Sequence, residues 1–179
     1  MSDADLSRRL ARLEAEQAVR RVMTRYMRLC DQPDCGFPIA DLGALFTTDA
    51  IWEGGGSTYG AAFGQHKGRP AIMEFIESFR HPKSHFTLNV HFLTSEDILV
   101  GNGFASDDTA EGSWIMLQLS TYADGHSSVL SARITARFAI EDAAWRIAHF
   151  RTENLFNAPW RRDLDDQTAF LAPAEATTR

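Results

Sequence analysis

Apolar residues recur at intervals of three or four positions along the N-terminal part of the chain, with arginine and glutamate filling most positions between them. The apolar positions of this stretch are Leu6, Leu10, Leu13, Val22, Tyr26 and Leu29. This spacing is typical of an amphipathic helix and predicts one long helix over about residues 3–31. Pro33 and Gly36 follow directly, and neither favours a continuing helix, so we expect the helix to end there.

Two shorter helices are predicted next. One covers about residues 39–46, where apolar side chains share a face. The other begins at Pro70, because a proline in the first turn of a helix loses no hydrogen bond, and it ends near Arg80. Between these helices, Ala50–Glu53 is a candidate for a short strand, and the glycine run Gly54–Gly56 is expected to form a turn.

From Ser84 onward the apolar period changes to two, which is the pattern of β-strands. The predicted strands lie at about residues 85–100, 110–122, 127–141 and 145–154. Helices followed by an antiparallel sheet make an α+β domain, in which the helices cover one face of a curved sheet. We assign this domain to residues 1–157 and expect residues 158–179 to form a partly ordered tail.

Composition and charge narrow the classes of partner. The 179 residues include 12 phenylalanines and 4 tryptophans, and 44% of the chain is hydrophobic, so one domain can build a core and line a pocket. Eighteen basic residues against 24 acidic ones give a net charge of −6. Because no basic cluster exceeds a doublet, nucleic acid is a poor partner.

The chain also lacks signals for membranes and secretion. No apolar run approaches the roughly 18 residues that a membrane-spanning helix needs, so no membrane association is expected. The N-terminus does not have the pattern of a secretion signal, and we expect a cytoplasmic protein. Cys30 and Cys35 form neither a CxxC pair nor a zinc-ligand set, and reduced thiols are expected, although spacing alone leaves a disulfide open.

Several short segments carry a resemblance to a known family. They are Tyr26–Asp31, Asp41–Ala50, Gly68–Ile72, His91–Ser95, Asp108–Trp114 and Trp145–Ile147. In this order they resemble the SnoaL-like branch of the NTF2-like superfamily, over about residues 8–155. The resemblance implies a cone-shaped α+β barrel with N-terminal helices packed on a curved antiparallel or mixed sheet. It also implies one deep, mostly apolar pocket and a homodimer or homotrimer.

The same resemblance suggests an activity. The superfamily includes scytalone dehydratase, bile-acid 7α-dehydratase, hexachlorocyclohexane dehydrochlorinase and non-catalytic subunits of ring-hydroxylating dioxygenases, so the fold does not decide the function. The resemblance implies a cofactor-free lyase of the dehydratase type, or an isomerase, acting on a hydrophobic, cyclic or steroid-like substrate. A non-catalytic subunit or ligand-binding module is one alternative, and a polyketide cyclase is another.

Asp31 and His91 resemble the Asp–His dyad of these enzymes, and Tyr26 resembles a tyrosine that donates a hydrogen bond to a substrate oxygen. A neutral imidazole can accept a proton near neutral pH, and a carboxylate behind it fixes the tautomer and stabilises the imidazolium. A phenol stays protonated at that pH. The plainer interpretation makes Asp31 a helix cap, His91 a buried strand residue and Tyr26 a core aromatic.

Alternation within the first long strand predicts a polar wall on one face. The residues on this face are His85, Thr87, Asn89, His91, Leu93 and Ser95. An alternative alignment takes His85 and Asn89 as the family's His-x-x-x-Asn element, which makes His85 a rival to His91. We prefer His91, because the segment after it, Ser95–Val100, resembles the family's continuation into a hairpin.

Arg133 and Arg151 are candidates for polarising a carbonyl or binding a carboxylate of the substrate. The alternation around Arg133 favours an outward side chain, and Arg151 is one position out of register with a pocket arginine of the dehydrochlorinase. Trp52, Phe75 and Trp114 are expected in the apolar lining, although each suits the core equally well. Metal motifs such as HxH or HExxH are absent from the sequence, so we expect neither a metal nor a cofactor.

Overall fold

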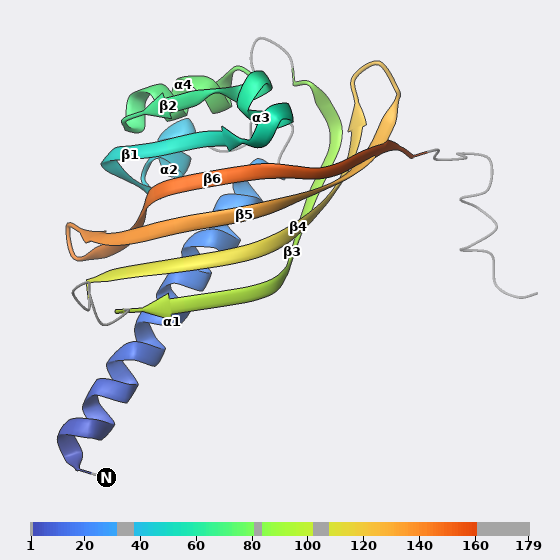
Figure 1. Cartoon of the computed structure of the whole chain (residues 1–179). Coiled ribbons are helices and arrows are strands. Elements are labelled where there is room, and N and C mark those ends of the chain that lie inside the picture. The colour runs from blue at the N-terminus through green and yellow to red at the C-terminus, as the bar shows by residue number, and fades with distance from the viewer. Residues whose placement is uncertain (1, 32–37, 81–83, 102–107, 161–179) are drawn as a thin grey trace, which may run out of the picture.

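The computed structural model describes residues 2–31, 38–80, 84–101 and 108–160 (Figure 1). Its elements are α1 (Asp3–Cys30), α2 (Ile39–Gly43), β1 (Phe46–Gly55), α3 (Gly56–Phe63), β2 (Gln65–Lys67), α4 (Arg69–Glu77), β3 (Phe86–Val100), β4 (Thr109–Tyr122), β5 (Ser127–Glu141) and β6 (Ala144–Pro159). The described strands form one open mixed sheet in the order β2-β1-β6-β5-β4-β3. The α+β class predicted from the sequence is confirmed.

Helices cover one face of this sheet. β3 to β6 are antiparallel neighbours, whereas β1 runs parallel to β6 and antiparallel to β2. Figure 1 shows α1 running across the inner face of the long strands, with α2, α3 and α4 gathered around β1 and β2. The predicted strands match β3 to β6, and β6 ends at Pro159. Cys35 and residues 161–179 of the expected tail lie outside the described residues.

α1 begins with a capping box, in which the Ser2 hydroxyl accepts from the Asp5 N–H and the Asp5 carboxylate accepts from the Ser2 N–H. Only its second half packs on the sheet, through buried residues such as Val19 and Met23. The long helix predicted over about residues 3–31 is confirmed, but the leucines of its first half do not reach the core. These leucines are 53–61% exposed, because the first turns extend beyond the sheet (Figure 1). They are Leu6, Leu10 and Leu13.

None of the helices in the described part of the chain combines the length and the apolar character that crossing a membrane requires.

The solid part of the core lies between the second half of α1 and one end of the sheet. Trp114 is 1% exposed and meets Phe138 edge to face, with ring centroids 6.3 Å apart. Its indole N–H donates to Glu96 Oε2 at 3.0 Å, so burying the ring leaves no polar group unpaired. Further along β4, Gln118 and Tyr122 line a cavity instead. β4 therefore contributes side chains to the solid core at one point and to the cavity lining further along.

The glycine run between β1 and α3 is not the turn that the sequence predicts. β1 continues through Gly55, and α3 begins at Gly56, where φ is +65°. α2 is correspondingly shorter than predicted, since Phe46 already belongs to β1. A Cβ on Gly54 would lie 2.1 Å from the Tyr59 carbonyl oxygen, so glycine is required for α3 to fold back onto the strand.

This close approach yields a prediction with a matched control. Gly54→Ala should destabilise the fold by about 1–3 kcal/mol, because the methyl group meets backbone that cannot move aside cheaply. A methyl group on Gly60, within α3, would have only an ordinary contact at 3.6 Å, so Gly60→Ala should be neutral or more stable by about 0.5–1 kcal/mol. Urea unfolding followed by circular dichroism measures both. Equal stability of the two variants would show that α3 does not pack on β1 in this way.

Candidate active site

A mostly apolar cavity lies between the C-terminal end of α1, helices α3 and α4, and the inner face of the sheet. It consists of two adjoining hollows of about 170 Å³ and 270 Å³. Both are lined by Tyr26, Cys30, Trp52, Phe63, Phe79, Phe86, His91 and Gln118. Because they share so many walls, we treat them as one chamber with a smaller lobe toward α4 and a larger lobe toward β5 and β6.

Asp31 and His91 meet at the wall of this chamber. One carboxylate oxygen of Asp31, Oδ1, accepts from both the backbone N–H of His91, at 2.9 Å, and its Nδ1, at 2.6 Å. The His91 side chain is 10% exposed and that of Asp31 26%. Because an ionised carboxylate only accepts hydrogen bonds, Nδ1 carries the proton in this pair. Nε2 of His91 is then the ring nitrogen that can accept a proton.

The end of α1 brings this pair together. Asp31 is the C-cap residue of the helix, and its N–H donates to the Met27 carbonyl at 2.8 Å. The preceding carbonyl, of Cys30, accepts from Asn89 Nδ2 at 3.0 Å. The last carbonyls of a helix have no partner within the helix, so a side chain on β3 that supplies one fixes where the helix ends. Asp31 is thereby held opposite His91.

Asn89 lies on the predicted polar face of the first long strand, and its amide is engaged with protein groups. Besides donating to Cys30, it accepts through Oδ1 from Gln118 Nε2 at 2.7 Å and from the Ser120 hydroxyl at 2.9 Å. The side chains of Asn89, Gln118 and Ser120 are all buried. A connected network of this kind stiffens the wall that carries His91.

Tyr26 and Trp52 are neighbours in the chamber lining and form a hydrogen bond with each other. The Trp52 indole N–H donates to the Tyr26 hydroxyl at 3.0 Å, and Trp52 stacks on Phe150 at a centroid distance of 5.7 Å. Burial raises the pKa of Tyr26 well above its ordinary value, and the neighbouring Cys30 thiol acts in the same direction. The phenol therefore remains a hydrogen-bond donor at every pH near neutrality.

Cys30 also lines the chamber, although the sequence indicates nothing for it beyond a reduced thiol. Burial raises its pKa to about 12, while the Tyr26 hydroxyl and the Arg80 charge act in the lowering direction. A thiol with this pKa is almost wholly protonated at neutral pH. It contributes an uncharged, weakly polar surface beside Tyr26.

The predicted polar face of the first long strand is only partly correct. The pairing of β3 with β4 shifts register between Phe86 and Leu88 and again between Thr94 and Asp97. Each bulge resets the alternation, so Thr87 and Ser95 are exposed rather than inward. His85, the rival to His91, is exposed and lies at the rim of the larger lobe, against Phe79 with ring centroids 5.5 Å apart.

The two arginines predicted for substrate binding do not line the chamber. Arg133 is exposed, and it alternates with the buried residues Ala132 and Ile134. Arg151 follows the inward Phe150, and its guanidinium turns to the outer face, where it donates to Glu53 Oε1 at 3.3 Å. Arg133 therefore faces outward, as the alternation around it indicates, and for Arg151 the offset of one residue places its side chain on the opposite face of the strand from Phe150.

Two of the three aromatic residues predicted for the lining do line the chamber, and one does not. Trp52 lines both lobes and Phe75 lines the smaller one, with Phe75 against Trp52 at a centroid distance of 4.7 Å. Trp114 belongs to the solid core described above, so its predicted place in the lining is wrong. The plainer interpretation, a core tryptophan, holds there.

Arg80 is a lining residue that the sequence analysis missed. It lies just past α4, lines the smaller lobe together with His91, and has a side chain that is 9% exposed. Its Nη1 donates to Glu77 Oε2 at 3.0 Å. The signal that points to it is the helical spacing from the buried Ile76, four positions earlier, which continues the inward face of α4 through the following turn.

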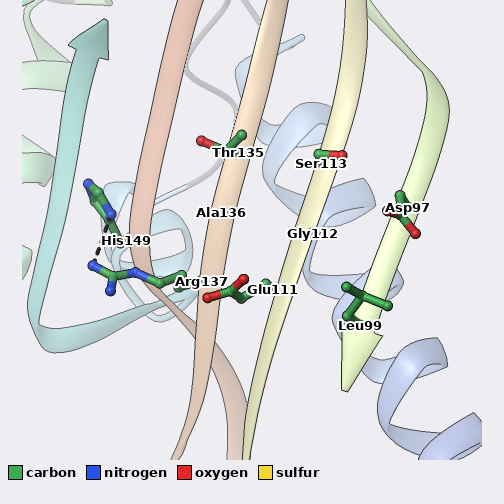
Figure 2. Close-up of a pocket in the computed structure, with 9 residues that line it drawn as sticks. All are labelled: Asp97, Leu99, Glu111, Gly112, Ser113, Thr135, Ala136, Arg137 and His149. Carbon is green, nitrogen blue, oxygen red and sulfur yellow. Dashed lines mark hydrogen bonds between the residues drawn. The ribbon is translucent and has the colours of Figure 1, made fainter. Parts of the chain in front are cut away.

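A second pocket lies on the outer face of the sheet. Its volume is about 340 Å³, and its charged residues include Asp97, Glu111 and Arg137. Figure 2 shows their side chains spread over separate strands, with α1 behind the sheet. Arg137 donates to His149 Nδ1 at 3.2 Å, which leaves His149 Nε2 to donate to Glu53 at 3.1 Å. Arg137, His149 and Glu53 thus form one chain of hydrogen bonds, while Asp97 and Glu111 lie on other strands.

Within the described ranges, no group of three or more His, Cys, Asp or Glu side chains comes together as a metal site would require. The chamber thus offers an imidazole–carboxylate pair, a buried phenol, a neutral thiol and one guanidinium in an apolar lining.

Comparison with known proteins places this geometry in a family. The model of the SnoaL-like domain matches residues 11–151. A search of curated proteins found no match. Solved structures share the fold at low sequence identity, so they support the fold and not a function.

Three of these structures illustrate the likeness. A type 2 hexachlorocyclohexane dehydrochlorinase, LinA, has a TM-score of 0.69 and 18% identity, covering 85% of this chain and 93% of its own. A scytalone dehydratase candidate from Novosphingobium aromaticivorans has a TM-score of 0.68 and 17% identity, covering 85% and 91%. An NTF2-like protein with a cystatin-like fold, from the same organism, has a TM-score of 0.64 and 22% identity, covering 86% and 90%.

The match to the domain model spans the greater part of the sequence, and the open cone of sheet and helices agrees with it. The chain therefore belongs to the SnoaL-like domain family.

Proposed function

We propose that the protein is a cofactor-free lyase of the dehydratase type, in which His91 removes a proton next to a carbonyl group of a hydrophobic cyclic substrate. The observation that carries the proposal is the 2.6 Å contact between Asp31 and His91 Nδ1 at the wall of an apolar chamber. This contact directs the protonated nitrogen toward Asp31 and leaves Nε2 as the base.

The elimination balances within these groups. Nε2 takes the α-proton, and the electron pair of that C–H bond enters the enolate and then forms the C=C bond as the β-hydroxyl leaves. The imidazolium returns its proton to the departing hydroxide, so water is released and His91 is neutral again. Asp31 stabilises the imidazolium in between, because it lies on the opposite side of the ring.

Tyr26 supports the same step from another wall. Its hydroxyl is buried, stays protonated because its pKa is raised by burial, and is oriented by the Trp52 N–H. A donor fixed in an apolar surrounding stabilises the negative charge that develops on a carbonyl oxygen during proton removal. We assign Tyr26 to this carbonyl, while Trp52 and Phe75 supply apolar surface against the ring system of the substrate.

An isomerase or a polyketide cyclase would use the same proton removal and differ in the fate of the enolate. A dehydrochlorinase would differ in the leaving group. A non-catalytic subunit would need no open chamber around the pair, and the two hollows of about 170 Å³ and 270 Å³ favour a site that holds a ligand. We therefore rank the lyase first.

Substitution of the pair tests the proposal. With 3-hydroxy-1-tetralone as substrate, dehydration yields 1-naphthol, which is followed by fluorescence. His91→Ala and Asp31→Asn should each lower kcat by about 10²–10⁴-fold, because general base catalysis and its supporting carboxylate contribute on that scale. Circular dichroism checks that both variants keep the fold.

The chain supplies a matched control. His126 contacts Asp124 through the same two atoms, backbone N–H and Nδ1 to one Oδ1, but on the exposed turn between β4 and β5. His126→Ala and Asp124→Asn should therefore leave kcat within about twofold, as surface substitutions usually do. If folded Asp31 and His91 variants turn over as fast as these controls, the lyase mechanism is wrong.

The thiol in the chamber gives a further expected outcome. Because burial raises the pKa of Cys30 to about 12 from an ordinary 9.0, its thiolate fraction at pH 8 should be about 10³-fold lower in the folded chain. In a Cys35→Ser background, iodoacetamide should alkylate Cys30 at least that much more slowly in the native protein than in urea. The native rate should rise tenfold per pH unit up to pH 10. A rapid native reaction at pH 8 would instead mark Cys30 as a nucleophile and favour covalent chemistry.

A further inference from the structure

Gln118 lies directly opposite His91 on the inner face of the sheet. The two residues are register partners in the antiparallel pair of β3 and β4, and both line both lobes of the chamber. Side chains that are opposite each other on one face of such a pair have Cβ atoms about 5 Å apart. A ligand group that His91 contacts is therefore also within reach of the Gln118 amide.

The hydrogen bonds of the chamber wall fix the orientation of this amide. The Cys30 carbonyl can only accept, so Asn89 turns its Nδ2 to that carbonyl, at 3.0 Å, and its Oδ1 toward β4. This oxygen also only accepts, and Gln118 Nε2 donates to it at 2.7 Å. Nε2 further donates to the Ser120 hydroxyl at 3.0 Å, and that hydroxyl donates to Asn89 Oδ1 at 2.9 Å. Both hydrogens of Nε2 are thus engaged within the wall.

The acceptor atom of the Gln118 amide, Oε1, is what this orientation turns toward the chamber. An amide carries its donors and its acceptor on different atoms, so Oε1 points away from the groups that Nε2 contacts. The reversed orientation would set Oε1 against Asn89 Oδ1, and two acceptors in contact at a buried place are unfavourable. The wall therefore presents an oriented hydrogen-bond acceptor beside His91.

We propose that Gln118 is a specificity-determining residue, whose Oε1 accepts a hydrogen bond from the leaving hydroxyl of the substrate. This inference rests on the proposed function, because it takes His91 as the base of the elimination. A hydroxyl can donate and accept at the same time. It donates its own hydrogen to Oε1 and accepts the proton of the His91 imidazolium on a lone pair. The C–O bond breaks, water leaves, and the Gln118 amide neither gains nor loses a proton.

The same acceptor disfavours a halide as the leaving group. A chlorine substituent has no hydrogen to donate, so it would displace water from Oε1 without replacing the hydrogen bond. A site that bonds a substrate hydroxyl rejects an analogue without that hydroxyl more strongly than an apolar pocket rejects a change in size. Oε1 therefore favours loss of water over loss of hydrogen chloride, and the substrate class is a cyclic β-hydroxy ketone.

Two substrates that give one product measure this selectivity. Elimination converts both 3-hydroxy-1-tetralone and 3-chloro-1-tetralone to 1-naphthol, and each rate is corrected for the spontaneous reaction. Gln118→Met keeps the size of the side chain and removes Oε1. It should lower the ratio of kcat/KM for the hydroxyl substrate over the chloride by about fivefold or more, the loss of one hydrogen bond. A smaller change in a variant that keeps the fold by circular dichroism overturns the proposal.

Two matched variants separate this role from a structural one. Ser120→Ala removes one bond of the wall and retains Oε1, so it should slow both substrates alike and keep the ratio within about twofold. Gln65→Met makes the same substitution at an exposed position of β2 and should change neither rate by more than about twofold. If Ser120→Ala lowers the ratio as far as Gln118→Met does, Gln118 acts through the packing of the wall and the proposal is wrong.

Binding without turnover keeps the outcome separable from that of the lyase. 2-Tetralol and 2-chlorotetralin carry the two groups on one ring system and have no carbonyl to acidify a C–H bond. Titration calorimetry should show that Gln118→Met weakens the alcohol relative to the chloride by about fivefold or more. If this shift appears although the wild-type chain has no turnover, recognition of a hydroxyl stands and the proposed chemistry is wrong. If turnover depends on His91 and neither ratio responds to Gln118→Met, the lyase stands and the role of Gln118 is wrong.

Discussion

The placement of the candidate active site depends on how the end of α1 is held against β3. Cys30 and Asp31 are consecutive, and Asn89 and His91 lie two apart on one face of the strand. Two hydrogen bonds, from Asn89 to the Cys30 carbonyl and from His91 to the Asp31 carboxylate, therefore fix both the height and the rotation of the helix on the strand. A helix must find partners for its last carbonyls. Here the strand that supplies this partner, β3, also holds His91 opposite Asp31.

What distinguishes this pair is its surroundings rather than its geometry. Asp124 and His126 repeat the same contacts in a turn, where the imidazole is 59% exposed, compared with 10% for His91. In the turn, water screens the charges and competes for every hydrogen bond. In the chamber, the imidazole is largely buried among aromatic side chains, so a charge that forms on the ring is stabilised mainly by fixed protein groups. The two pairs differ because His91 lines a cavity on the inner face of the sheet, whereas His126 lies on an exposed turn.

Periodicity along the sequence predicts α1, α4 and the four long strands well, because burial of one face imposes a fixed repeat. It fails where the repeat is interrupted. The bulges in β3 expose Thr87 and Ser95 although simple alternation turns them inward. Gly54 and Gly55 extend a strand rather than forming a turn, since lack of a side chain permits close packing as well as bending. The contact between Asp31 and His91 spans 60 residues, so a family pattern indicates it and local sequence does not.

The position of the chamber's arginine follows from the same constraint on the sheet. An inward arginine at position 133 or 151 would displace packed side chains on the neighbouring strands, and at both places the apolar neighbour faces inward instead. A residue just past the end of a helix can place a long side chain in the cavity lining without displacing packed side chains of the sheet. Arg80 uses this route, with Glu77 less than one turn behind it to share the charge. The packed inner side chains of β5 and β6 are therefore preserved.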